Sequence, residues 1–135
     1  MRYYLDTNTI IYAVNGKYPS ILDRIRILPT QSIIIPTVVL AELEYGARRS
    51  NSYERAMEIH KKFISQFGKA DFNTLASNHY GIIRHQLESK GTIIGPNDLM
   101  IAATVMADKE GILITHNTKE FLRVPGLKVE DWTEE

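Results

Sequence analysis

The chain has 135 residues, which suits one domain spanning 1–135 with a hydrophobic core of its own. It contains no cysteine, so disulfides, thiolate metal sites and cysteine nucleophiles are excluded, and an intracellular protein is expected. Sixteen basic and sixteen acidic side chains give a net charge of zero, which argues against an overall basic field, so contact with nucleic acid would depend on local basic patches.

Three short runs of β-branched or aromatic residues predict buried strands, at 3–5, 32–35 and 112–115. The longest apolar run, 33–41, contains Pro36 and is far shorter than the ~20 residues that span a bilayer. No export signal precedes the first strand. We therefore expect a cytoplasmic protein without a membrane partner.

The first long helical pattern covers 52–67. Asn51 is the expected N-cap, with Glu54 three residues later as its partner in a capping box. Gly68 is expected to end this helix.

Two further helices are predicted over 73–90 and 97–110. Gly91 is expected to close the first helix and Gly111 the second, which is entered through Gly95-Pro96. Strands that alternate with helices predict an α/β fold with a mostly parallel central sheet flanked by helices.

Several polar residues follow the predicted strands. In parallel sheets, ligands collect beyond the carboxyl ends of the strands, where helix N-termini also lie. Asp6 follows the first strand directly, and Thr37 follows the second and is expected to cap the helix that carries Glu42. Thr115 and Asn117 follow the last predicted strand. These side chains are therefore expected to share one rim of the sheet.

The acids of this rim also have structural interpretations. Asp6 can cap the next helix, and Asp98 can interact with its helix N-terminus for ~0.3 to 1 kcal/mol. Glu42 is harder to explain, because its neighbours at helical spacing are apolar, whereas Glu44 has Arg48 four residues later. A metal ion would compensate the Glu42 charge. We therefore predict that the three acids converge on one pocket that binds a divalent cation.

Four short motifs are spread over nearly the whole chain. They are Leu5-Asp6-Thr7-Asn8, Ala41-Glu42-Leu43 with Tyr45-Gly46, Gly95-Pro96-Asn97-Asp98, and Thr115-His116-Asn117 with Val124-Pro125-Gly126. In this order and at these separations, they resemble the PIN-domain family, and within it the VapC-type toxins of bacterial toxin–antitoxin pairs. Any one motif would be weak, because an Asp-Thr-Asn tripeptide is common by chance. Four together make a strong signal.

The resemblance implies a three-layer α/β sandwich and an endoribonuclease that depends on Mg²⁺ or Mn²⁺. It also implies a homodimer and silencing by a cognate antitoxin in a higher toxin–antitoxin assembly. The family's acids fall on Asp6, Glu42 and Asp98. Many relatives have a fourth aspartate where this chain has Asn117, with Glu120 one helical turn beyond, so a second metal ion is expected only with substrate. The expected RNA is a tRNA, with the anticodon region of initiator tRNA as the leading candidate.

These residues suggest hydrolysis by a metal-activated water. Asp6 and Asp98 would bind the principal ion, and Glu42 would bind it through water or deprotonate the attacking water. Asn117 and Thr115 would orient waters or phosphate oxygens. Crowded carboxylates raise one another's pKa, so weaker activity is expected at mildly acidic pH. The supporting residues are Thr7 and Asn8, expected to fix Asp6, together with Thr115 and Glu120, and the candidate RNA-backbone contacts are Arg48, Arg84, Lys90 and Lys119.

Three other functions fit part of the pattern. A phosphatase of the haloacid-dehalogenase type also places an aspartate after its first strand, but it needs a second one where this chain has Asn8. A non-catalytic PIN-like module for protein or RNA is favoured by the neutral charge and Asn117, and disfavoured by the three acids. A housekeeping RNA-processing nuclease would share the site, although the short chain favours the toxin. The sequence does not identify the RNA, its cleavage position or the antitoxin.

Other conspicuous side chains are interpreted as structural. Trp132 is expected in the core or at a dimer contact, and His116 is expected to be incidental to the site. Tyr45 and Tyr80 are expected to pack helices together, because stacking on RNA would require exposed rings.

Overall fold

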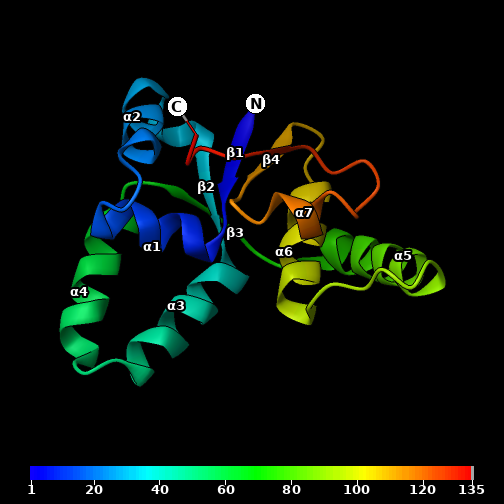
Figure 1. Ribbon diagram of the computed structural model, residues 1–135, viewed down its shortest axis with the longest axis horizontal. Coiled ribbons are helices and arrows are strands. Elements are labelled where there is room, and N and C mark those ends of the chain that lie inside the picture. The colour runs from blue at the N-terminus through cyan, green and yellow to red at the C-terminus, as the bar shows by residue number, and fades with distance from the viewer. Residues whose placement is uncertain (135) are drawn as a thin grey trace.

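A five-stranded parallel sheet forms the centre of the protein (Figure 1). The structure is a computed structural model that describes residues 1–134. Across the sheet the strand order is β3–β2–β1–β4–β5, and every pairing is parallel. The strands are β1 (Arg2–Leu5), β2 (Ile33–Pro36), β3 (Gly68–Ala70), β4 (Gly111–Ile114) and β5 (Val129–Glu130). The predicted fold class is therefore confirmed.

The order of the strands places a site beside the centre of the sheet. The chain builds outward from β1 through β2 to β3 and then returns to the other side of β1 with β4. Leu5 and Ile114 are register partners, so Asp6 and Thr115 emerge side by side from the ends of β1 and β4. Such a reversal leaves a crevice at the carboxyl ends of the strands, where α/β proteins bind ligands.

Helices lie on both sides of the sheet (Figure 1). Helices α1 to α4 lie on one side, and α5 and α6 pack against each other on the other side. The helices are α1 (Thr7–Asn15), α2 (Pro19–Ile27), α3 (Thr37–Arg49), α4 (Tyr53–Ile64), α5 (Thr74–Ser89), α6 (Pro96–Met106) and α7 (Thr118–Phe121), and a 3₁₀ turn covers Thr30–Ser32.

The central strands and α6 provide much of the core. All four residues of β4 are buried, and so are Leu99, Val105 and the residues 101–104 of α6. A helix that is apolar nearly all round must be covered on several sides, and α6 is covered by α5 and the sheet. Trp132 is 1% exposed and packs on Tyr3, with ring centroids 5.5 Å apart, so its predicted place in the core is confirmed.

The predicted boundaries around α4 are wrong at both ends. The N-cap is Ser52, whose hydroxyl accepts a hydrogen bond from the Arg55 amide at 3.4 Å, and not Asn51. The helix ends at Ile64, and Gly68 opens the short strand β3. Gly68 pairs with Ile34, and a Cβ atom there would lie 3.0 Å from the Ile34 Cδ1 atom. Glycine at this position therefore leaves room for the Ile34 side chain of the neighbouring strand and does not end a helix.

Two other local predictions are also wrong. Thr37 is the first residue of α3 and does not cap it, because Pro36 occupies the N-cap position. Helix α6 ends at Met106, and Gly111 begins β4. A Cβ atom on Gly111 would lie 2.7 Å from the Val105 carbonyl oxygen, so glycine is required where the turn after α6 packs back on the helix. No helix within residues 1–134 has the length and apolarity needed to cross a membrane.

Candidate active site

Residues from all four motifs line one small pocket of about 130 Å³. Asp6 lies between β1 and α1, Glu42 lies in the middle of α3, Asp98 lies in the first turn of α6, and Asn117 directly precedes α7. Thr7, Asn8, Ile101 and Phe121 complete the lining. The carboxyl ends of β1 and β4 and the first turns of α1 and α6 therefore bring together residues that are far apart in the sequence.

Asp6 is the most enclosed acid of this pocket, with 6% of its surface exposed. It caps α1, and its Oδ1 atom accepts a hydrogen bond from the Thr9 amide at 2.9 Å. Burial raises the pKa of the Asp6 carboxyl, and the charge of Glu42 raises it further, while the hydroxyl groups of Thr115 and Thr9 act in the opposite direction. The expected capping role and a place in the acidic pocket thus belong to the same side chain.

Asp98 is half-buried and accepts no side-chain or amide hydrogen bond from residues 1–134. Burial raises the pKa of its carboxyl to about 6, and the negative charges of Glu42, Glu120 and Asp6 add to this effect. Within residues 1–134, no neighbouring cation lowers the pKa of the Asp98 carboxyl again. Asp98 is therefore a carboxylate whose surroundings favour either a proton or a bound cation.

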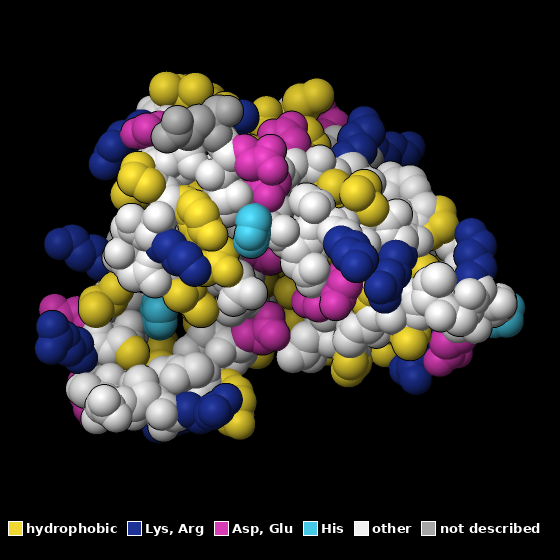
Figure 2. All heavy atoms as spheres, viewed as in Figure 1, with side chains coloured by type: hydrophobic (Ala, Val, Ile, Leu, Met, Phe, Trp, Pro, Cys, Tyr) yellow, Lys and Arg dark blue, Asp and Glu magenta, His cyan; other side chains and the backbone are white. Residues whose placement is uncertain are grey.

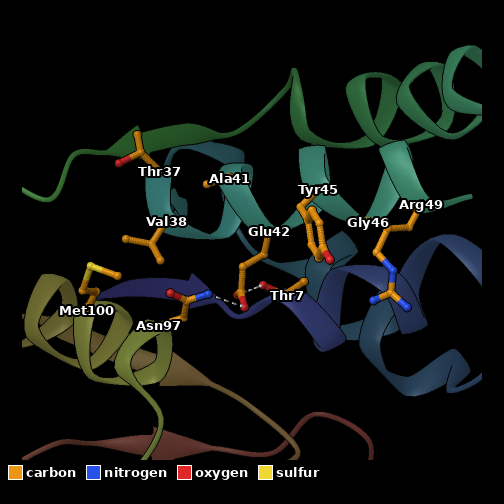
Figure 3. A pocket seen from close by; sticks show the side chains of 10 residues that line it. All are labelled: Thr7, Thr37, Val38, Ala41, Glu42, Tyr45, Gly46, Arg49, Asn97 and Met100. Carbon is orange, nitrogen blue, oxygen red and sulfur yellow. Dashed lines mark hydrogen bonds between the residues drawn. The ribbon is translucent and has the colours of Figure 1, made fainter.

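Glu42 is held in place by two hydrogen bonds (Figure 3). Its Oε1 atom accepts a hydrogen bond from the Thr7 hydroxyl at 2.5 Å, and its Oε2 atom accepts one from the side-chain amide of Asn97 at 3.3 Å. Thr7 therefore orients Glu42, whereas the sequence had predicted that it would fix Asp6. Asn97 was not predicted, although it directly precedes Asp98 in the same motif.

The remaining predicted support residues lie around the pocket in different ways. Thr115 is fully buried, and its hydroxyl accepts a hydrogen bond from the Asn117 amide at 2.9 Å. Asn8 is exposed at the pocket, and Glu120 lies outside the lining but close enough to raise the pKa of Asp98. Thr9, which holds Asp6, was missed. Its position three residues after an N-cap aspartate is the usual one for the capped amide, so the signal was present.

The pocket has the right donors for a divalent cation but is not a complete chelate. Within residues 1–134, no three acidic or histidine side chains are placed together to hold an ion by themselves. The donors that line the pocket are carboxylate and amide oxygens, which are the ligands of Mg²⁺ and Mn²⁺. Magnesium keeps several water ligands and usually takes only one or two carboxylates from a protein. The residues present therefore fit a partly hydrated ion.

Comparison with known proteins identifies the family. A sequence model described as the PIN domain matches residues 3–127. The chain belongs to the PIN-domain family. It is 40% identical over 133 residues to the tRNA(fMet)-specific endonuclease VapC of Salmonella typhimurium and to the ribonuclease VapC2 of Rickettsia felis, and each match covers 98% of both chains. The resemblance inferred from the four motifs is thereby confirmed.

The fold of this PIN domain matches solved structures of the same type. The crystal structure of VapBC2 from Rickettsia felis bound to a DNA fragment from its promoter has a TM-score of 0.90 and 38% sequence identity. That match covers 98% of this chain and 99% of the other. The PIN domain described here is therefore a VapC-type endoribonuclease.

None of the four basic residues predicted to contact RNA lines the acidic pocket of this PIN domain. Arg48 bonds Glu44 at 2.8 Å and lies 3.8 Å from the ring centre of Tyr53, and Arg84 bonds Glu88 at 3.2 Å. Lys90 lies at the end of α5 and Lys119 in α7. On the face shown in Figure 2, acidic side chains gather near the middle and most basic ones lie around them.

Proposed function

We propose that this PIN domain is the toxin of a toxin–antitoxin pair and that it hydrolyses a phosphodiester bond in RNA with a divalent metal ion. One observation carries the proposal. Three carboxylates from separate motifs line one small pocket, and burial and mutual repulsion raise the pKa of two of them. Such an arrangement stabilises a fold poorly, because it destabilises the charged forms of Asp6 and Asp98. A bound cation would offset that cost.

Each residue has a distinct task in the proposed mechanism. Asp6 and Asp98 would hold the ion, which when bound would activate a water molecule and neutralise charge on the scissile phosphate. Glu42, oriented by Thr7 and Asn97, would position the attacking water and accept its proton. Asn117 would donate a hydrogen bond from its side-chain amide to a phosphate oxygen.

The substrate and the partner are proposed from the relatives. The Salmonella relative is named for its action on tRNA(fMet), which supports a tRNA substrate and the anticodon region of initiator tRNA as the first to test. Solved structures of VapBC complexes superpose closely on this chain, which supports a cognate antitoxin as the partner. Mg²⁺ and Mn²⁺ are both proposed as the ion.

The test is cleavage of a panel of tRNAs and rRNA by the purified protein, with Mg²⁺, with EDTA, and after Asp98→Asn. We expect EDTA and Asp98→Asn each to lower the rate at least about 100-fold, the upper end of what loss of a partner to a metal ligand costs. The exposed Asp71→Asn is the control for removing one negative charge and should cleave normally. Cleavage that survives both EDTA and Asp98→Asn would exclude the mechanism.

A titration with Mn²⁺ separates the nuclease from a non-catalytic module. If Asp6 is a metal ligand, Asp6→Asn should weaken Mn²⁺ binding, measured by electron paramagnetic resonance of the free ion. A module that only holds protein or RNA should bind Mn²⁺ equally before and after the substitution.

A further inference from the structure

A second, larger cavity adjoins the acidic pocket. We call it the α3 groove. It has a volume of about 730 Å³ and shares Thr7 and Glu42 with the acidic pocket (Figure 3). Its walls are largely apolar, with Val38 and Ala41 from α3 and Met100 from α6. A molecule that reacts in the acidic pocket can therefore continue into this groove without leaving the surface of the protein.

Tyr45 presents an open aromatic ring to the α3 groove. Its side chain projects from α3 beside Glu42 (Figure 3), and 63% of its surface is exposed. The expectation that Tyr45 packs helices together is therefore wrong. Large aromatic side chains are usually buried, so an exposed ring next to the acidic pocket indicates a surface that contacts another molecule. The Tyr45 ring is therefore exposed enough for a base of RNA to stack on it.

Arg49 accompanies this ring at the far end of the groove. Its Cζ atom lies 5.5 Å from the Tyr45 ring centroid, and it forms no ion pair with residues 1–134. The adjacent Arg48 differs, because Glu44 and the Tyr53 ring engage it. The only charged side chains that line the α3 groove in the described part of the chain are thus Glu42, which belongs to the acidic pocket, and Arg49.

The three residues lie along one face of α3. Glu42, Tyr45 and Arg49 are spaced by three and four residues, which puts them on the same side of an α-helix. With a rise of 1.5 Å per residue, Tyr45 lies about 4.5 Å and Arg49 about 10.5 Å beyond Glu42 along the helix axis. The acid of the pocket, an aromatic ring and a cation therefore follow one another along one line of α3.

We propose that the α3 groove binds the unpaired nucleotide next to the scissile phosphate, with its base stacked on Tyr45 and the following phosphate held by Arg49. This inference rests on the proposed nuclease function. Proteins that read single-stranded RNA stack bases on aromatic rings and on arginine guanidinium groups, and they follow the backbone with cations. We favour RNA as the occupant because the groove continues into the acidic pocket. Apart from Glu42 of that pocket, the one charged side chain that lines the groove within residues 1–134 is the cation Arg49, which suits a phosphate.

The test measures RNA binding and cleavage separately. Binding of a fluorescein-labelled, single-stranded RNA of 12 nucleotides is followed by fluorescence anisotropy in the Asp98→Asn background. Stacking on one ring is worth enough that Tyr45→Ala should weaken binding about 5- to 100-fold, while Tyr45→Phe, which keeps the ring, should stay within about twofold. Arg49→Ala should lower the slope of log Kd against log salt by about 0.7, the value for one phosphate of a single strand.

The control for charge is Arg26→Ala on α2, which removes an exposed arginine and should leave both the binding and its salt dependence unchanged. Circular dichroism checks that each variant is folded. Cleavage by the same substitutions in the otherwise unaltered protein, with the tRNA panel as substrate, should show losses that parallel the losses in binding.

Several outcomes would overturn the inference. Normal RNA binding and cleavage by Tyr45→Ala would do so, as would equal losses for Tyr45→Ala and Tyr45→Phe, and as would the absence of any binding to the labelled RNA. Unchanged RNA binding with a lower mass in light scattering would show that the groove faces a second copy of the chain. An unaltered protein that cleaves no RNA would instead refute the proposed function, so the two failures are distinguishable.

Discussion

Replacing Asp98 by asparagine is expected to stabilise the metal-free protein while removing its nuclease activity. The Asp98 carboxyl is half-buried among Glu42, Glu120 and Asp6, and its pKa is raised from 3.8 to about 6. The folded protein therefore binds a proton more tightly than the unfolded chain does. Stability that depends on this proton is fully present below about pH 4 and is lost as pH rises through 6, so the charged Asp98 destabilises the fold at neutral pH.

The size of this effect follows from the same surroundings. One pKa unit corresponds to ~1.4 kcal/mol, so the full difference is worth about 3 kcal/mol before correction. Asp98 is only partly buried, and solvent screening reduces this to about 1 to 2 kcal/mol. The favourable interaction of an acid with the N-terminus of α6 offsets ~0.5 kcal/mol of it. We therefore expect Asp98→Asn to raise the free energy of unfolding by about 1 kcal/mol at pH 7.5.

Urea unfolding followed by circular dichroism measures this difference. The unaltered protein and Asp98→Asn are compared in EDTA at pH 7.5 and at pH 4, with Asp71→Asn as the control. The gain should be small at pH 4, where Asp98 is almost fully protonated in the folded protein and close to half protonated in the unfolded chain. Saturating Mn²⁺ at pH 7.5 should stabilise the unaltered protein and the Asp71→Asn control more than it stabilises Asp98→Asn. A variant that is less stable than the unaltered protein in EDTA at pH 7.5, or a gain that is as large at pH 4 as at pH 7.5, would refute this account of Asp98.

Three further predictions follow from the contacts around the pocket and the sheet. Initial cleavage rates should fall between pH 7.5 and 5, because about nine tenths of Asp98 is protonated one unit below its pKa. The midpoint of this fall should move to lower pH as the Mn²⁺ concentration is raised, and a midpoint independent of Mn²⁺ would contradict competition between proton and metal. Thr7→Val, which removes the hydrogen bond to Glu42, should lower kcat/KM for the cleaved RNA about 10- to 100-fold, whereas Thr7→Ser should keep both the bond and the activity. Equal kcat/KM values for the two variants would exclude the orienting role of Thr7. Asp108→Asn, which breaks the paired bonds to Arg2 at 2.5 and 2.6 Å, should lower the free energy of unfolding in urea by about 1 to 2 kcal/mol at pH 7. Since Arg2 holds the pKa of Asp108 well below its usual range, this loss of stability should shrink as pH falls below about 4. A loss that stays constant with pH would show that the charge is not responsible.

The sequence was a good guide to the site wherever a residue's role depends on its nearest neighbours. Asp6 follows a short apolar strand and caps the next helix, as its sequence position predicts. Glu42 lies on an apolar stretch without a nearby cation, which predicted that something must compensate it. The order of strands and helices predicted a parallel sheet, and a parallel sheet predicted that the acids would meet at one edge.

The sequence was a poor guide where two distant segments meet. Strand β3 has only three residues and exists because it pairs with β2, so no periodicity could predict it. The exposure of Tyr45 could not be predicted either, because an aromatic residue in a helix usually packs inward, and only the tertiary structure shows that this ring lines the α3 groove. Thr7 was expected to serve its neighbour Asp6, yet its hydroxyl bonds Glu42, which is 35 residues away.

The sequence by itself therefore determined which acids are unusual and which family they belong to, because local periodicity and motif order are properties of the chain alone. Only the tertiary structure decided how strongly these acids change one another's pKa. Asp98 has a raised pKa because the packing of the helices partly buries its carboxyl, and because α3 and α7 also bring the charges of Glu42 and Glu120 close to it. Burial and the distances between charges depend on which elements pack together, and those quantities set the electrostatics of the site.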